Sequence, residues 1–279
     1  MSREIPRAAV VQAVADLFRR ANRELGADMV AALEAARGEE ASPTGRRVLE
    51  QILENARLAR TEGLPMCQDT GFPVVFAFLG EDAHVDDLAG AVDEGIRCGT
   101  AAGYLRASVV RHPLDRVNTG DNTPALLHLA LVAGDRLRLA VTPKGAGSEN
   151  MSRLAMLRPA DGEEGVVDFV VETVRAAGPN PCPPLVVGVG IGSNFEGVAL
   201  LAKRALLRPV GEPSADPRLA ALERRMAARV RDLGIGPAGF GGSVTALAVH
   251  AEAGPTHIAS LPVAVNISCH ATRHAEAVL

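Results

Sequence analysis

The sequence contains few aromatic residues and no excess of basic ones. Aromatic side chains make up 3% of the 279 residues, Trp is absent, and Tyr104 is the only tyrosine. Lys and Arg number 29 against 33 Asp and Glu, which gives a formal net charge of −4. Nucleic-acid binding normally requires a basic surface, and single strands are held by stacking on aromatic rings. We therefore expect no nucleic-acid partner.

Long apolar segments are also absent. No apolar run reaches the roughly 20 residues that a membrane-spanning helix needs. The N-terminal stretch MSREIPRAAVVQAVADLF mixes charges with apolar residues and has no signal-peptide cleavage site. We therefore expect a cytoplasmic protein with no membrane association. In that reducing compartment the cysteines are not expected to form disulfides.

The cysteines lack the close pairing that marks common metal motifs. No C-x-x-C pair occurs, which excludes a zinc ribbon and a ferredoxin-type ligand run. Cys67, Cys182 and Cys269 lie in distinctive loop settings, and a rigid loop can present a thiolate to a metal without a later ordering cost. Metal binding, chemistry and simple packing all remain open for these three. Cys98 lies in an ordinary helical segment and is expected to pack as a small buried hydrophobe.

Hydrophobic periodicity predicts a mixed α/β fold in a single domain, 1–279. Helical spacing of apolar residues over 5–36 and 44–62 predicts a helical N-terminal region, 1–63. The remainder, 64–279, is expected to form an α/β body with a mixed β-sheet. Its expected helices are 86–105, 163–177, 196–207 and 217–233. Its expected strands are 72–79, 185–191, 243–251 and 258–265, plus a strand pair, 125–132 and 136–142, around the turn at 133–135.

Five segments follow the order of motifs in a known enzyme family. They are 66–71 (MCQDTG), 118–125 (NTGDNTPA), 143–150 (PKGAGSEN), the region 182–206, and the region that holds Thr256, His257 and Cys269. In this order they resemble the class I fumarate hydratase and L(+)-tartrate dehydratase family, over about residues 45–275. The resemblance is to the α subunit, the cluster-binding part of these iron-dependent hydro-lyases. It implies a hydro-lyase activity.

The resemblance implies that Cys67, Cys182 and Cys269 hold a [4Fe–4S] cluster. Three thiolates on four irons leave one iron with an open position, where it acts as a Lewis acid on substrate oxygens. Dehydration of a 2-hydroxy acid needs this help, because hydroxide is a poor leaving group and departs more readily as water. The reaction therefore also needs a proton donor.

The proton donors that the resemblance implies are Asp69 and His257, as an acid pair near the leaving hydroxyl. Taken from the sequence alone, Asp69 also suits a turn, because Thr70 and Gly71 follow it. His257 equally suits a packed loop position. Both alternatives stay open until the positions of these residues are known.

Substrate binding is implied for Gln68, Arg106, Gly145 and Gly147. Gln68 can donate to a carboxylate, and Arg106 can bind one with two parallel hydrogen bonds, although it also fits a solvated helix charge. The loop 145–147 can expose backbone N–H groups as an anion-binding nest. It lacks the spacing of a phosphate loop, so nucleotide binding is not expected.

The sequence offers no residue that we can assign as the proton-abstracting base. In single-chain members of the family a second domain supplies it, and nothing here matches that domain. We therefore expect a separate β subunit that carries the base, in an α2β2 assembly. The expected reaction is the reversible dehydration of malate to fumarate, with dehydration of tartrate to oxaloacetate as the alternative. A non-catalytic iron–sulfur sensor or structural protein, or a zinc-binding domain, would be a different class of function.

Overall fold

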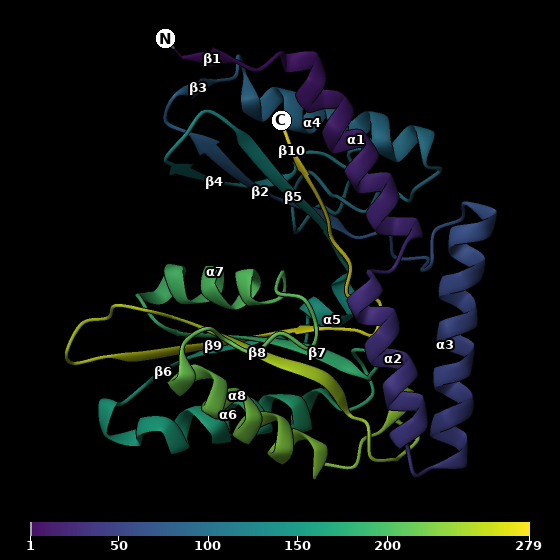
Figure 1. Cartoon of the computed structure of the whole chain (residues 1–279), viewed down its shortest axis with the longest axis vertical. Coiled ribbons are helices and arrows are strands. Elements are labelled where there is room, and N and C mark those ends of the chain that lie inside the picture. Colours follow the sequence, from purple (N-terminus) through teal and green to yellow (C-terminus); the bar gives the residue numbers. More distant parts are fainter. Residues whose placement is uncertain (1) are drawn as a thin grey trace. The chain divides into compact units, whose positions relative to one another are not determined.

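The computed structural model describes residues 2–279, and its fold is mixed α/β, as the sequence predicts (Figure 1). The chain forms two compact units. Unit 1 comprises the residues up to Gly26, Asn55–Ala146 and Arg273–Leu279, and unit 2 comprises Ala27–Glu54 and Gly147–Thr272. The chain therefore passes between the units four times. The division into an N-terminal region and a body at residues 63 and 64 stays a prediction.

The centre of unit 1 is a four-stranded sheet with the order β10-β5-β2-β4. Its strands are β2 (Phe72–Gly80), β4 (Leu126–Val132), β5 (Leu137–Lys144) and β10 (Ala275–Val278). β4 runs parallel to β2, whereas β5 runs antiparallel to both β2 and β10. The short strands β1 (Arg3–Glu4) and β3 (Ala83–His84) form a separate parallel pair. The sheet is therefore mixed.

Two helices, α1 (Arg7–Arg23) and α4 (Leu88–Ala102), cover one face of this sheet (Figure 1). Val14 and Phe18 of α1 are fully buried and belong to the same hydrophobic core as Val75 of β2. Each such side chain contributes about 1.5–3 kcal/mol by leaving water. This shared core holds β2 and β5 rigid, and the predicted site residues of unit 1 follow or precede these two strands.

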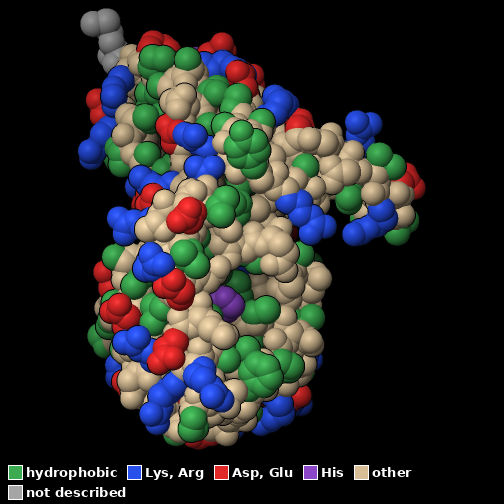
Figure 2. All heavy atoms as spheres, turned by 90° about the vertical axis from the view of Figure 1, so that its right-hand side faces the viewer, with side chains coloured by type: hydrophobic (Ala, Val, Ile, Leu, Met, Phe, Trp, Pro, Cys, Tyr) green, Lys and Arg blue, Asp and Glu red, His purple; other side chains and the backbone are tan. Residues whose placement is uncertain are grey.

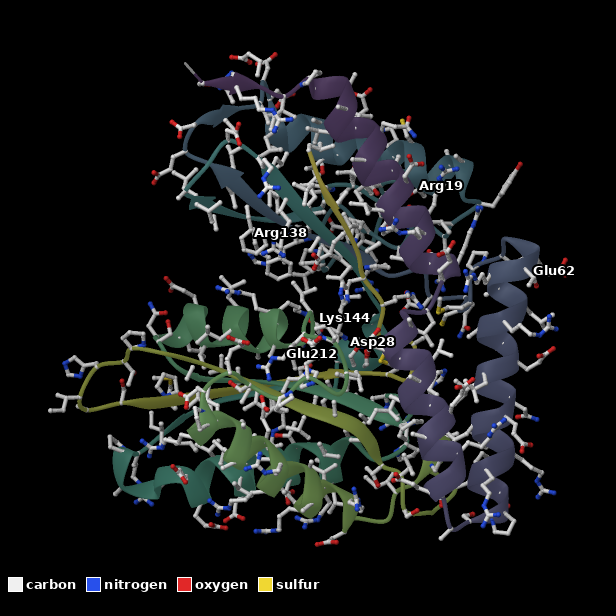
Figure 3. All side chains as sticks on the ribbon, viewed as in Figure 1. Arg19, Asp28, Glu62, Arg138, Lys144 and Glu212 are labelled. Carbon is white, nitrogen blue, oxygen red and sulfur yellow. The ribbon has the colours of Figure 1, made fainter. Side chains whose placement is uncertain are left out.

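The other face of the sheet carries large side chains from β2 and β5. The guanidinium carbon of Arg138, labelled in Figure 3, lies 3.9 Å from the ring centroid of Phe78. Phe76 stacks on His128 of β4, with ring centroids 4.9 Å apart. This face is therefore filled by aromatic and cationic side chains.

β4 and β5 do not form the strand pair that the sequence predicts, because β2 lies between them and pairs with both. Their connection crosses the end of β2. There the N–H of Gly80 donates to the carbonyl of Arg136, and the N–H of Asp82 donates to that of Gly134, each at 2.9 Å. A Cβ at Gly80 would lie 2.2 Å from the oxygen of Gly134. The pairing prediction is wrong because a turn signal does not specify which strand its flanks contact.

Unit 2 contains a second four-stranded sheet, with the order β6-β9-β7-β8. Its strands are β6 (Arg153–Leu157), β7 (Leu185–Gly192), β8 (Ala246–Gly254) and β9 (Leu261–Ser268). β8 runs parallel to β7, whereas β9 runs antiparallel to both β6 and β7. Helices α6 (Gly162–Ala177) and α8 (Pro217–Arg231) share a core with one face. Helix α7 (Phe195–Ala205) packs on the other face, where Gly188 and Gly190 alternate with the core residues of β7.

Most predicted helices and strands are confirmed, with ends that shift by three residues or fewer. The helix predicted over 5–36 is instead two helices, α1 and α2 (Ala27–Glu39), because Glu24 is extended (φ −121°, ψ 120°) and Gly26 follows. Helix α3 (Pro43–Glu62) is as predicted, and the four-residue α5 (Ala146–Glu149) and the strands β1, β3, β6 and β10 are additional. The packing prediction for Cys98 is wrong, because its side chain is exposed on α4.

Charged residues form a largely buried network in unit 2. Arg208, whose side chain is 14% exposed, pairs with Glu223 and with Glu252. Glu223 also accepts two backbone N–H groups. Burial, and after it the positive charge of Arg208, lowers the pKa of the nearby His250. His250 is therefore neutral in the folded chain at neutral pH.

Both signs of charge are interspersed on the surface. Figure 2 shows Lys or Arg side chains beside Asp or Glu side chains over the lower part of the face that it draws. In unit 2, Arg218 of α8 pairs with Glu163 of α6 at 2.7 Å. Such exposed pairs contribute at most about 1 kcal/mol each. Within residues 2–279, no helix combines the length and the apolar character that crossing a bilayer requires.

Candidate functional site

Cys67, the first predicted ligand, lies in a turn of unit 1 between α3 and β2. The preceding residue is anchored: the N–H of Met66 donates to the carbonyl of Asn22 at 2.9 Å, and Asn55 Nδ2 donates to the carbonyl of Met66 at 2.8 Å. The N–H of Asp69 points at Cys67 Sγ, at an N–S distance of 3.4 Å. Hydrogen bonds to cysteine sulfur are among the features that tune iron–sulfur centres. The turn therefore presents a partly exposed sulfur from a fixed backbone.

The carboxylate of Asp69 links this turn to the loop after β5. Its Oδ1 accepts the N–H of Gly71 at 3.0 Å, and its Oδ2 accepts the N–H of Ala146 at 2.8 Å. The structure therefore brings Cys67, Asp69 and the loop that begins at Gly145 together in unit 1. One N–H of the predicted anion nest is already occupied by a side chain of the protein itself.

Arg106 lies beside the same turn. The hydroxyl of Thr70 donates to the backbone carbonyl of Arg106 at 2.9 Å. The Arg106 side chain is exposed, and among the described residues it makes no hydrogen bond or ion pair. Gln68, next to Cys67, is exposed as well. Both side chains are therefore available to an anion.

Asn122 connects the motif at 118–125 to the Cys67 turn, a role that the sequence alone did not reveal. It is fully buried in a left-handed conformation (φ 62°). Its Oδ1 accepts the N–H groups of Ser108 (2.8 Å) and Val109 (3.2 Å), and its Nδ2 donates to the carbonyl of Gly71 at 3.3 Å. One side chain thus ties three segments together, and only the motif's polar composition gave any signal of it.

The neighbouring Asp121 fixes the same motif through its charge. Burial acts to raise the pKa of Asp121, but hydrogen bonds from Thr123, Arg97 and Thr119 outweigh it and lower the pKa to about 2. The carboxylate accepts from Arg97 Nε of α4 at 3.0 Å. Asp121 therefore stays ionised at physiological pH and holds the motif to α4.

In unit 2 the structure brings Cys182 and Cys269 to the same end of the sheet. Cys182 precedes β7 and Cys269 directly follows β9, and these strands pair with Val186 opposite Ser268. His270 joins the two loops: its N–H donates to the carbonyl of Cys182 at 3.3 Å, and its Nδ1 lies 3.0 Å from the same oxygen. Cys182 adopts a left-handed conformation (φ 54°) and exposes its thiol.

A polar network anchors the segment that holds Gly147. Asn266 of β9 donates from Nδ2 to Glu149 of α5 at 2.8 Å and to the hydroxyl of Ser152 at 2.9 Å. Lys203 of α7 also pairs with Glu149. Gly147 itself is exposed within α5. The network therefore ties the predicted substrate-binding glycine to the strand that ends at Cys269.

His257 lies apart from the two cysteines of its unit. It is exposed in the loop between β8 and β9, where its Nδ1 accepts the N–H of Ala259 at 3.1 Å. It lines an open cavity of about 470 Å³ together with Asn194 and Phe195. Cys269 is at the other end of β9, an eight-residue strand that spans about 26 Å. Unit 2 therefore does not bring His257 together with Cys182 and Cys269.

A second cavity of about 470 Å³ in unit 2 lies between α2 and β8. Its lining includes Asp28, labelled in Figure 3, together with Glu39, Arg231 and Leu247. Asp28 is already engaged, because its Oδ2 accepts the N–H of Val210 at 2.8 Å. None of the predicted site residues lines this cavity.

The donor set fits an iron–sulfur cluster. Within the described residues, Cys67, Cys182 and Cys269 form no disulfide, lie on loops at strand ends, and are each at least partly exposed. Thiolate sulfur is the ligand that iron–sulfur clusters require. Cys67 belongs to unit 1 and the other two to unit 2. Neither unit by itself, within the residues described, gathers three His, Cys, Asp or Glu side chains that could hold a single metal ion.

Comparison with known proteins agrees with these features. The family model described as fumarate hydratase (Fumerase) matches residues 11–278. The "Putative L(+)-tartrate dehydratase subunit alpha" of Methanocaldococcus jannaschii is 43% identical over 270 residues, which cover 94% of each chain. The L(+)-tartrate dehydratase subunit alpha of Escherichia coli strain UTI89 is 34% identical over 251 residues, which cover 88% of this chain and 82% of the relative. The chain described here therefore belongs to the fumarate hydratase (Fumerase) family.

Proposed function

We propose that this chain is the α subunit of a [4Fe–4S] hydro-lyase that reversibly dehydrates a 2-hydroxy dicarboxylate, with malate to fumarate and water as the leading reaction. The observation that carries the proposal is the convergence of Cys182 and Cys269 at one end of the unit 2 sheet, joined through His270. The family membership supports the reaction class. A sensor without turnover would not need the exposed guanidinium of Arg106, which makes no hydrogen bond or ion pair within residues 2–279.

Cys67, Cys182 and Cys269 would hold the cluster. When bound, the cluster supplies a Lewis acid that polarises the hydroxyl and carboxylate oxygens of the substrate. The chain itself supplies orientation. Arg106 binds a substrate carboxylate through its guanidinium, and Gln68 donates to the same substrate. The 145–147 loop adds backbone donors other than the N–H of Ala146, which Asp69 already occupies.

Asp69 and His257 are the proposed acid pair for the departing hydroxyl. The carboxylate of Asp69 is oriented by the N–H groups of Gly71 and Ala146. A carboxyl oxygen with two lone pairs can hold the transferred proton while it keeps one such bond. Proton donation to the leaving oxygen then accompanies loss of water.

The position of His257 supports the α2 part of the proposed α2β2 assembly. The length of β9 separates it from Cys269 of its own chain. In an assembly with two α chains, His257 of one chain can serve the site of the other. The base that removes the proton next to the carboxylate is assigned to a separate β subunit, in line with relatives that are named as α subunits.

L(+)-tartrate is the second candidate substrate. The names of the relatives from Methanocaldococcus jannaschii and Escherichia coli favour it. Tartrate differs from malate by one hydroxyl, and a site with a well-placed partner for that hydroxyl discriminates strongly between the two.

The test is to purify the full chain anaerobically with its partner chain, reconstitute it with iron and sulfide, and assay both acids. We expect fumarate from malate, or oxaloacetate from tartrate, only when both chains and the cluster are present. The chain without its partner is the control. If the loaded pair dehydrates neither acid, the hydro-lyase proposal fails.

A further inference from the structure

Arg273 is a buried arginine whose positive charge is not balanced by a carboxylate within the described residues. It follows Cys269 by four residues and belongs to unit 1. Its side chain is buried, with 5% of the residue exposed. Its Nη2 donates to the backbone carbonyl of Asp69 at 2.6 Å, and its own carbonyl accepts the hydroxyl of Thr142 at 2.9 Å. Its Nε is buried and has no hydrogen-bond partner within the described residues. Within the same residues, no carboxylate forms an ion pair with it.

A buried guanidinium without a counter-charge is costly. Arginine does not lose its proton in proteins, so it cannot escape the cost by becoming neutral. Buried charges are normally paired, and an unpaired one destabilises the folded chain. Arg208 in unit 2 shows the usual solution, because it contacts the carboxylates of Glu223 and Glu252. Arg273 has a carbonyl oxygen where Arg208 has two carboxylates.

The contact of Arg273 places its charge on the Cys67 turn. The carbonyl that accepts its hydrogen bond is that of Asp69, and the N–H of Asp69 points at Cys67 Sγ. Cysteine binds metals as the thiolate, which brings negative charge to this turn, and a dicarboxylate substrate brings more. In the part of the chain that the structure describes, Arg273 has no carboxylate to balance its positive charge. The thiolate and the dicarboxylate that the proposed site holds when it is loaded would supply that negative charge.

We infer that Arg273 is a positioning residue that fixes the Cys67–Asp69 turn and supplies the positive charge that offsets the negative charge of the loaded site. The inference rests on the proposed function, because it takes the cysteine-ligated cluster as its counter-charge. In the cluster-free chain the charge of Arg273 is a cost. In the loaded chain it stabilises the cluster. The sign of its effect on stability therefore reverses between the two states.

The test compares variants of the full chain with its partner chain, before and after reconstitution with iron and sulfide. Arg273→Gln keeps a hydrogen-bond donor and removes the charge, whereas Arg273→Lys keeps the charge. Arg208→Gln is the matched control, a buried arginine that has carboxylate partners. The readouts are the thermal unfolding midpoint in each state and the rate of iron release to a chelator.

For Arg273→Gln we expect a midpoint equal to or above wild type in the cluster-free chain. In the loaded chain we expect iron release at least about tenfold faster than wild type, a change of roughly 1.4 kcal/mol. Arg273→Lys should restore most of the slow release, and Arg208→Gln should lower the midpoint in both states.

Two results overturn the inference in distinguishable ways. If wild type loads iron and sulfide but Arg273→Gln lowers the midpoint in both states and Lys does not rescue it, Arg273 is merely structural and the proposed function stands. If wild type binds no iron and sulfide, the proposed function fails and the inference fails with it.

Discussion

The two sheets of this chain have the same arrangement of strand directions but present different chemistry. The strand orders are β10-β5-β2-β4 and β6-β9-β7-β8. In each order the first three strands alternate in direction, and the fourth runs parallel to the third. Cys67 precedes β2 as Cys182 precedes β7. Gly145 follows β5 as Cys269 follows β9. The same sheet end therefore carries two thiols in unit 2, and one thiol with the loop proposed to bind substrate in unit 1.

The sheets differ most on one face, the face opposite α1 and α4 in unit 1 and opposite α6 and α8 in unit 2. In unit 2, glycines on β7 allow α7 so close that a Cβ at Gly190 would lie 2.1 Å from the oxygen of Val198. In unit 1, the equivalent inner strand presents Phe76 and Phe78 instead. The same arrangement of strands thus accepts either a helix or a layer of aromatic side chains, depending on the size of alternate residues in a single strand.

The largest expected effect comes from removing one proposed cluster ligand at a time, either from unit 1 or from unit 2. Cys182→Ser in unit 2 and Cys67→Ser in unit 1 should each lower kcat by at least about 100-fold and abolish stable iron and sulfide binding, because a hydroxyl replaces a soft thiolate ligand. Iron and sulfide analysis and dehydration assays measure both effects.

Cys98→Ser is the matched control for these variants, because Cys98 is an exposed thiol on α4. It should retain wild-type iron content and activity. Equal losses for Cys98→Ser and Cys182→Ser would contradict the ligand assignment.

The next effect sharpens the contrast between glycine and phenylalanine on the two inner strands. Gly190→Ala should lower the free energy of unfolding by about 3 kcal/mol, because the backbone of α7 must move away from the new methyl group. Gly38→Ala in α2, where a Cβ meets nothing within 4 Å, should leave it unchanged or raise it by at most about 1 kcal/mol. Denaturant unfolding of both variants tests this, and similar values for the two would refute the close-packing explanation.

A smaller effect concerns charge in unit 1. Hydrogen bonds lower the pKa of Asp121 to about 2 against an ordinary 3.8, so its contribution is present above about pH 4 and is lost as pH falls toward 2. After discounting for its partial exposure, we expect Asp121→Asn to cost about 1 kcal/mol at pH 7. The difference from wild type should shrink in unfolding measurements at pH 3, and a constant difference would argue against an ionic origin.

The smallest expected effect concerns a titratable side chain in unit 2, that of His250. The lowered pKa of His250 means that, as pH falls through about 6.5, the unfolded chain binds a proton more readily than the folded chain does. Wild type should therefore lose stability as pH falls through 6.5, and His250→Gln should remove part of that slope. Unfolding midpoints between pH 7.5 and 5.5 measure it. An unchanged slope would mean that other groups carry the dependence.

The sequence predicted the positions of helices and strands better than it predicted which strands pair with one another. Periodicity located most elements, since it reports which face of a segment is buried. It did not show that β2 separates β4 from β5, because this pairing depends on the crossing at Gly80. It also missed the break after Arg23, where the apolar spacing of a helix continues although the backbone becomes extended at Glu24.

The same limit applies to the site. Cys182 and Cys269 were proposed as ligands from a resemblance, and the strand pairing brings these two together. Asn122 and Arg273 were not proposed, because their partners lie 51 and 204 residues away in the sequence. His257 was proposed near the leaving hydroxyl, and only the length of β9 reveals its distance from Cys269.

The repeated passage of the chain between units affects the order of events during synthesis. The sheet of unit 1 is complete only when β10 has been made, after the whole segment 147–272 of unit 2. At bacterial or eukaryotic elongation rates this takes on the order of ten seconds. Until then β5 has a free edge on the nascent chain, and the carbonyl of Asp69 has not met Arg273. The Cys67 turn is thus among the last parts to be fixed, so the proposed iron–sulfur cluster would be inserted after translation rather than during it.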